Sequence, residues 1–190
     1  MSKTKKQAWL KLLVAALCVT VLAGCGGKDP AVAEPTAEEA TQDNATIYQG
    51  GVAAYQDGDL EEAFRKFKVL ADKGDPEGQF NVGVMYHEGK GVAQDDKEAV
   101  AWWSKAAEQG NANAQDNLGL RYAKGEGVER DLVQAYKWFA VAAMAGKSQS
   151  AMNNMKVVEA RLKPEEIGQG QMMAKEWMMK DRLKQPALEK

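Results

Sequence analysis

Hydroxyl and imidazole side chains, which could carry nucleophilic catalysis, are sparse in this sequence. The serines beyond residue 25 are Ser104, Ser148 and Ser150, and none has a lysine three residues further on. His87 is the only histidine, so no second imidazole is present for a relay or for a two-histidine zinc motif. These residue types and spacings predict a protein that is not an enzyme.

Glycine pairs and aspartates recur at a fixed spacing and raise the question of phosphate or carboxylate chemistry. Gly89 and Gly91 flank a lysine, but no strand pattern precedes them, and the second copy of this turn carries Glu126 where a phosphate would lie. Asp95 and Asp131 stand at positions typical of helix N-caps. We therefore predict no catalytic, cofactor or metal site, with a paired-carboxylate hydrolase left open as an alternative.

The composition is that of an ordinary globular domain. The 190 residues are 45% hydrophobic, 27% charged and 7% aromatic, which argues against disordered, collagen-like and polytopic membrane proteins. The formal charge of −2 becomes more negative if the lysine-bearing residues 1–24 are removed. An acidic domain with scattered lysines binds nucleic acid poorly, so no nucleic-acid partner is expected.

Residues 1–24 have the organisation of a secretory signal peptide. Lys3, Lys5 and Lys6 make a positive start, and the uncharged run 12–23 follows. This run of about 12 residues is shorter than the roughly 20 that a membrane-spanning helix needs. We therefore predict that the segment is removed rather than retained as an anchor.

The residues around Cys25 predict a lipid anchor. The run Leu22-Ala23-Gly24-Cys25 resembles the lipobox of bacterial lipoproteins. The resemblance implies cleavage before Cys25 and attachment of several acyl chains to it, which together anchor a protein stably. In Gram-negative lipoproteins an aspartate after the cysteine retains the protein at the inner membrane. Gly26 departs from that pattern, so the resemblance favours the outer membrane, facing the periplasm.

Residues 25–45 are predicted to be the lipidated cysteine and a disordered tether. The stretch contains Pro30 and Pro35, several acids, and no large aliphatic residue beyond Val32. Such a composition cannot bury enough apolar surface to order itself. We expect it to space the folded part, which starts at residue 46, away from the lipid surface.

The folded part repeats itself. Residues 76–111 align on residues 112–147 without a gap and share thirteen identities over thirty-six positions. Apolar and small residues recur within each segment at three- and four-residue steps, which predicts two amphipathic helices per segment. A fixed period of this length is the mark of a solenoid.

Particular residues are expected to shape each repeat. Gly89 is predicted to end the first helix in a left-handed conformation. Asp95 and Glu98 are predicted to open the second helix as a capping box. Gly83 is expected to let the paired helices approach closely, with Trp102 filling the remaining space.

The pattern extends beyond these two segments. Residues 46–74 match the repeat with a shorter turn, which predicts another helix pair. Past residue 147 the pattern decays, as expected of a terminal cap, with Ser150 and Asn153 keeping the register. Residues 164–190 are predicted to form a C-terminal capping helix and tail, with methionines around Trp177.

The repeat resembles that of the Sel-one-like repeat (SLR) family, relatives of the tetratricopeptide repeat. In the first of the two closest copies the residues that carry the resemblance are Gly83, Tyr86, Gly89, Gly91, Asp95, Trp102, Ala106 and Ala107. The resemblance implies an all-α fold, an α-solenoid of antiparallel helix pairs over residues 46–163. It also implies binding of protein partners without chemistry.

By analogy with tetratricopeptide arrays, the first helix of each pair should line a concave face. The candidate partner groove predicted in this way consists of Phe80, Asn81, Val84, His87, Asp116, Asn117, Leu120, Met152, Asn153 and Lys156. Its amides are able to hold a peptide backbone. The alternatives are that these residues pack between helices, that His87 is merely solvated near a helix end, and that the methionine-rich C-terminal helix is the docking surface.

Together these features predict a lipid-anchored periplasmic scaffold or adaptor that binds a protein or peptide partner. Two other classes stay open. One is a cell-envelope hydrolase acting on peptidoglycan or β-lactams, and the other is a structural subunit of an envelope complex.

Overall fold

The computed structural model describes residues 43–146 and 148–184, which form eight α-helices and no strand. The helices are α2 (Asn44–Asp57), α3 (Leu60–Asp72), α4 (Pro76–Glu88), α5 (Asp96–Glu108), α6 (Ala112–Lys124), α7 (Leu132–Gly146), α8 (Gln149–Glu159) and α9 (Pro164–Lys184). The predicted all-α solenoid is confirmed. The predicted signal peptide, Cys25 and nearly all of the tether lie outside the described residues. None of the described helices combines the length and apolarity needed to cross a membrane.

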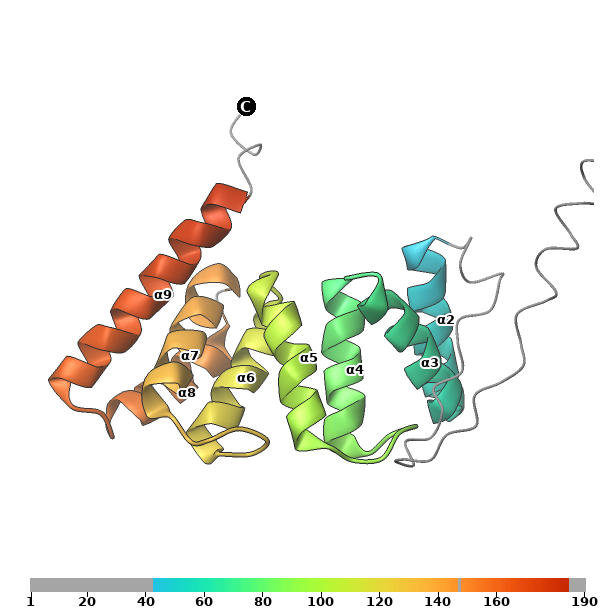
Figure 1. Ribbon diagram of the computed structural model, residues 1–190, viewed down its shortest axis with the longest axis horizontal. Helices are drawn as coiled ribbons and strands as arrows, with labels where there is room; N and C mark the ends of the chain where they lie inside the picture. Colours follow the sequence, from blue (N-terminus) through green and yellow to red (C-terminus); the bar gives the residue numbers. More distant parts are fainter. Residues whose placement is uncertain (1–42, 147, 185–190) are drawn as a thin grey trace, which may run out of the picture. The chain divides into compact units, whose positions relative to one another are not determined.

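The described helices belong to one compact unit, Val32–Lys190, in which each helix from α2 to α8 packs on the next along the chain. Figure 1 shows this succession, with α9 following α8 at the end of the array. The last two helices break the rule, because α9 packs on α7 and makes hardly any contact with α8. The pairs α2–α3, α4–α5 and α6–α7 are therefore closed, and the pair α8–α9 is not.

Aspartates start the second helix of each repeat, as predicted, but the capping box is only half formed. Asp95 Oδ1 accepts the backbone N–H groups of Lys97 and Glu98 at 2.8 and 3.1 Å. The reciprocal bond from Glu98 is replaced, because the Asp95 N–H donates to the carbonyl of Tyr86 at 2.9 Å. This bond pins the end of the loop to the helix before it, a role that a local motif cannot reveal.

Gly89 and Gly91 have the positive φ angles that the turn requires. Gly89 ends α4 with φ +66°, which confirms the predicted left-handed cap. Gly91 has φ +69°, and a Cβ built on it would lie 2.1 Å from the carbonyl oxygen of Leu60. The loop therefore lies directly on the start of α3, so Gly91 connects two successive pairs.

Each closed pair is held by a glycine that faces an aromatic ring. A Cβ built on Gly51, Gly83 or Gly119 would lie 2.8, 2.6 or 2.7 Å from the ring of Phe67, Trp103 or Phe139, respectively. The expected role of Gly83 is thus confirmed, but the ring that fills the space is Trp103 rather than Trp102. Trp103 is buried, and its Nε1 donates to the carbonyl of Phe80 at 3.2 Å.

Trp102 instead packs towards the preceding pair. It belongs to the core cluster that includes Phe64, Phe67 and Leu70. The ammonium groups of Lys105 and Lys68 lie 3.8 and 5.0 Å from the centroid of its ring, in cation–π geometry. The two adjacent tryptophans therefore serve different contacts, one within a pair and one between pairs.

A buried glutamine joins each repeat to the one before it. Gln79 donates to the carbonyl of Ala71 at 3.3 Å, and its Oε1 accepts from Gln109 at 2.7 Å. Gln115, 36 residues later, donates to the carbonyl of Ala107 at 3.1 Å, but its buried Oε1 has no hydrogen-bond partner. The reason is in the sequence, because alanine stands at position 145, which corresponds to Gln109.

The register shifts by one residue before α8. The cap Asn111 accepts from Ala114, and the cap Ser148 accepts from Ala151, which is a step of 37 residues rather than 36. Ala114 and Ala151 are both fully buried. The prediction that Ser150 and Asn153 keep the register of the repeat is therefore wrong by one residue. Asn154, not Asn153, is the equivalent of Asn117.

The start of α9 is capped without the usual serine or threonine. The backbone N–H of Lys163 donates to the side chain of Glu166 at 2.7 Å, which supplies the reverse half of a capping box. Gly170 then lets α9 approach α7, because a Cβ there would lie 2.8 Å from the ring of Tyr136. Gln171 also donates to the Tyr136 hydroxyl at 3.3 Å.

Candidate partner-binding grooves

The predicted groove residues on α4 line a cavity together with residues of α2 and α3. Phe80, Asn81 and Val84 border a mostly apolar cavity of about 480 Å³, here named the N-terminal groove. Its other lining residues are Val52, Tyr55, Gln56, Phe67 and Met85. Phe80 and Val84 are also half-buried against the core around Trp103. Phe80 and Val84 thus both pack between helices and line the groove, so the two alternatives hold together.

His87 is not a simply solvated residue. Its Nδ1 lies 2.6 Å from Asp96 Oδ1, and its ring lies 5.7 Å from that of Trp103. Arg121 Nη1 lies 3.4 and 3.3 Å from the two ring nitrogens, and the same guanidinium pairs with Glu126. The side chain is 34% exposed in the last turn of α4, so His87 is partly solvated and also contacts charged neighbours on α5 and α6.

Arg121 is a buried charge that the sequence analysis missed. Its side chain is 7% exposed, its guanidinium lies 5.8 Å from the Trp103 ring, and its Nε has no hydrogen-bond partner. The repeat itself carries the signal that could have revealed it, because the preceding repeat has Met85, fully buried, 36 residues earlier. Arg121 thus occupies the repeat position at which the preceding repeat buries a methionine.

The predicted groove residues on α6 lie in contacts between helices. Asp116 accepts from Ser150 at 2.9 Å and from Asn154 at 3.2 Å, so its carboxylate holds α6 to α8. Leu120 is half-buried against the C-terminal core cluster, and Asn117 is half-buried. Asp116 is thus engaged within the chain, whereas Asn117 and Leu120 stay candidates for contact with a partner.

The predicted residues on α8 separate from one another because of the register shift. Met152 is half-buried and lines a second cavity. Asn153 is exposed and accepts from Gln149 at 3.1 Å, and Lys156 is exposed. The true equivalent of Leu120 is Val157, which is 59% exposed.

The second cavity lies between α8 and α9, with α7 as its floor. It measures about 480 Å³, and we name it the C-terminal groove. Its lining is mostly apolar and rich in methionine, and consists of Tyr136, Ala140, Ala143, Met144, Met152, Met155, Gln171, Ala174, Lys175 and Met178. Methionine side chains are flexible and polarizable, which suits adaptable binding surfaces.

The glycine–ring contact that closes the other three pairs is missing from the last pair. With the register shift, Lys156 on α8 corresponds to Gly119 on α6. Because Gly119 has no side chain, the Phe139 ring can reach the backbone of α6. A lysine side chain at the equivalent position leaves no room for such a contact. Helix α9 packs on α7 through Gly170, and the methionine-bearing face of α8 is left uncovered.

Exposed apolar side chains gather at the same end of the chain. The large apolar side chains that stand out from the described surface are Met144, Val157, Met172 and Met179, at 63, 59, 56 and 60% exposure. Trp177 and Met178, by contrast, are half-buried and pack against the C-terminal core cluster.

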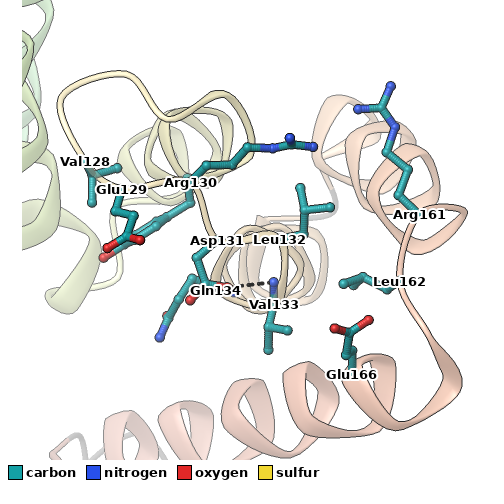
Figure 2. Close-up of a pocket in the computed structure, with 11 residues that line it drawn as sticks. Val128, Glu129, Arg130, Asp131, Leu132, Val133, Gln134, Arg161, Leu162 and Glu166 are labelled. Atoms are coloured by element: carbon teal, nitrogen blue, oxygen red, sulfur yellow. Dashed lines mark hydrogen bonds between the residues drawn. The ribbon is translucent and has the colours of Figure 1, made fainter.

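A third cavity is polar and lies beside the α6–α7 loop. It measures about 660 Å³ and is lined by Tyr122, residues 128–134, Arg161, Leu162 and Glu166. Figure 2 shows Arg130 and Arg161 on one side of it and Glu166 on the other. Burial, and next the charge of Asp131, raise the pKa of Tyr122. Arg130 Nε donates to the carbonyl of Ala123 at 3.2 Å, Asp131 caps α7 and Glu166 caps α9, so these groups are committed to the fold.

No metal-ligating cluster marks a further site in the described part of the chain. Three or more histidine, cysteine, aspartate or glutamate side chains do not come together anywhere in residues 43–146 and 148–184. The surface features that remain are the two apolar grooves and the exposed methionines.

The helix pairs, their glycine contacts and the grooves define an α-solenoid of repeated helical hairpins with apolar grooves. Residues 76–111 and 112–147 each match the family model of the Sel1 repeat. The chain therefore contains two Sel1 repeats in tandem, covering α4 to α7. No curated protein matches the chain.

Two solved structures share this arrangement. One is c5321, a protective antigen present in uropathogenic Escherichia coli strains and displaying an SLR fold, with 29% identity and a TM-score of 0.71 over 80% of this chain. The other is a Sel1 repeat protein from Oxalobacter formigenes, with 31% identity and a TM-score of 0.56 over 68% of this chain. This chain covers 34% of the first protein and 55% of the second, so both are considerably longer.

Proposed function

We propose that this protein is a binding scaffold whose C-terminal groove takes a segment of a partner protein. The observation that carries the proposal is the open pair α8–α9. Three pairs fill the space between their helices with an aromatic ring, whereas the fourth leaves a methionine-lined cavity of about 480 Å³. The tandem Sel1 repeats support the same class of function, since stacked helical repeats present extended binding surfaces.

The chemistry of the groove specifies the partner segment. Its walls are apolar, and Lys175 lines it beside Met178. Lys156, on α8, adds a second exposed cation one turn after Met152. A segment with bulky apolar side chains and a neighbouring acid is the complement of this surface.

We propose further that the scaffold is a lipoprotein anchored through Cys25 in the outer membrane, facing the periplasm. The support is the lipobox-like run before Cys25 and the glycine after it, both outside the described residues. Cys25→Ala should abolish fatty-acid labelling and leave unprocessed precursor. Gly26→Asp should move the protein towards the inner membrane in a sucrose gradient. A Cys25→Ala protein that is still labelled would refute the anchor.

The groove is tested by crosslinking in living cells with two matched variants. A photoreactive residue at Met155 should capture one defined protein, whereas the same residue at Lys97, exposed on α5, should not. Met144→Glu should abolish the capture because Met144 lines the groove. Val157→Glu, which puts the same charge on an equally exposed side chain outside the groove, should preserve it. Equal capture by both variants would refute the groove.

The scaffold is proposed to act by binding alone. Purified protein incubated with muropeptides or a chromogenic β-lactam should therefore give no turnover. Turnover that a single carboxylate substitution abolishes would instead establish an envelope hydrolase.

A further inference from the structure

The outer face of α9 carries two exposed methionines and two opposite charges in one stripe. Met172, Lys175, Glu176 and Met179 follow the steps i, i+3, i+4 and i+7, so they share one face of the helix. All four are exposed. The opposite face seats α9 on α7 through Gly170, Ala174 and Trp177. In Figure 1 the last helix of the array is α9, so no other described helix covers this stripe.

The stripe is complementary to itself in one orientation. An antiparallel pair of α9 helices, related by a two-fold axis between residues 175 and 176, places Met172 opposite Met179 of the partner subunit. The same axis places Lys175 opposite Glu176 of the partner subunit, and each of these contacts occurs twice. A parallel pair in register would instead set lysine against lysine and glutamate against glutamate.

We propose that two copies of this protein associate through antiparallel contact of their α9 outer faces. The charges are available for it, because neither Lys175 nor Glu176 forms an ion pair within the described residues. Pairing covers the two methionines that are 56 and 60% exposed in the single chain. One helix on each side makes a small interface, so the association is weak and reversible.

Charge reversal tests the pairing without disturbing the fold, since both residues are exposed. Lys175 also lines the C-terminal groove, so Glu176→Lys, which lies outside that groove, is the deciding single reversal. Two full-length copies with different affinity tags are expressed together, and co-purification of one with the other is measured. Lys175→Glu in both copies sets glutamates against each other and should lower co-purification on the order of ten-fold, as should Glu176→Lys in both. A Lys175→Glu copy with a Glu176→Lys copy restores opposite charges on both sides and should recover the parent level.

A second arm tests the orientation. A Met172→Cys copy should form a disulfide with a Met179→Cys copy, whereas two Met172→Cys copies should crosslink no more than the unsubstituted chain does. Val157→Glu, on α8 and outside the stripe, should leave co-purification unchanged. The proposal is overturned if the parent copies do not co-purify, if single reversals have no effect, or if the mixed reversals fail to restore the parent level. Those outcomes would assign the stripe to another occupant, and the partner groove is tested separately by the Met155 crosslink and the Met144→Glu variant.

Discussion

The pairs α6–α7 and α8–α9 follow each other along the chain, yet their helices meet in different ways. In α6–α7 the ring of Phe139 rests on Gly119, and α6 buries five of its residues. In α8–α9 the corresponding position is Lys156, and the buried residues of α8 are Ala151 and Val158. The comparison teaches that the last pair lacks the glycine–ring contact that closes α6–α7, and that its second helix packs on α7 instead of α8.

The largest effect is expected when the aromatic ring that fills a closed pair is removed. Trp103→Ala should lower the free energy of unfolding by roughly 3–5 kcal/mol, because a buried ring leaves a cavity. Met178→Ala, in the open pair, should cost about 1 kcal/mol or less, since its site is half-buried beside a groove. Urea denaturation of the two variants measures the contrast. Equal losses would mean that the last pair is packed as tightly as the others.

The next effect sharpens the comparison at a single repeat position. Gly119→Ala should cost about 1–3 kcal/mol, because the new Cβ would lie 2.7 Å from the Phe139 ring. Lys156→Ala, at the equivalent position of α8, should change stability by about 0.5 kcal/mol or less, since the site is exposed. Thermal or urea melts would contradict the equivalence if Lys156→Ala were the more destabilising change.

Most of the fold could be predicted from the sequence because its signals are local. The helix pairs follow from the period of apolar residues, and the ends follow from Gly89 and Asp95. The same reasoning misassigned the packing of Trp102 and Trp103, because adjacent aromatic residues give no local signal of which neighbour each one touches.

The open end of the molecule could not be predicted, for a different reason. An asparagine at 153 matches Asn117 at a step of 36 by coincidence, and this match conceals the one-residue shift before α8. Nothing in the α9 sequence states that it packs on α7, since this contact joins two helices that are not consecutive along the chain. Of the predicted groove, Phe80, Asn81, Val84 and Met152 line cavities, and Asp116 is engaged within the chain.

A smaller effect is expected at the buried arginine between the two Sel1 repeats. Arg121→Met restores the residue type of Met85 and should leave the free energy of unfolding within about 1 kcal/mol of the parent, or above it. Arg121→Ala should cost roughly 2–3 kcal/mol, because it leaves a cavity beside Trp103. Urea melts separate the two. A large loss with methionine would show that the contacts of Arg121 with Glu126 and His87 stabilise the junction.

The smallest effect is a gain. Position 145 aligns with Gln109 of the preceding repeat at the step of 36 residues, so Ala145→Gln is expected to supply a donor for the unpaired Oε1 of Gln115. We expect about 0.5–1 kcal/mol of added stability from this bond. A double variant with Gln115→Ala should lose the gain. If the gain persisted in that background, helix propensity rather than the hydrogen bond would be its cause.

The most direct test of the open pair is amide hydrogen exchange of the purified chain, resolved by helix. Because α8 lacks a closed partner helix, residues 149–159 should exchange on the order of ten-fold or more faster than residues 112–124 of α6. This contrast is the result that the account predicts. Equal protection of the two helices would contradict it, because α8 would then be packed as firmly as its counterpart and the groove would not be open.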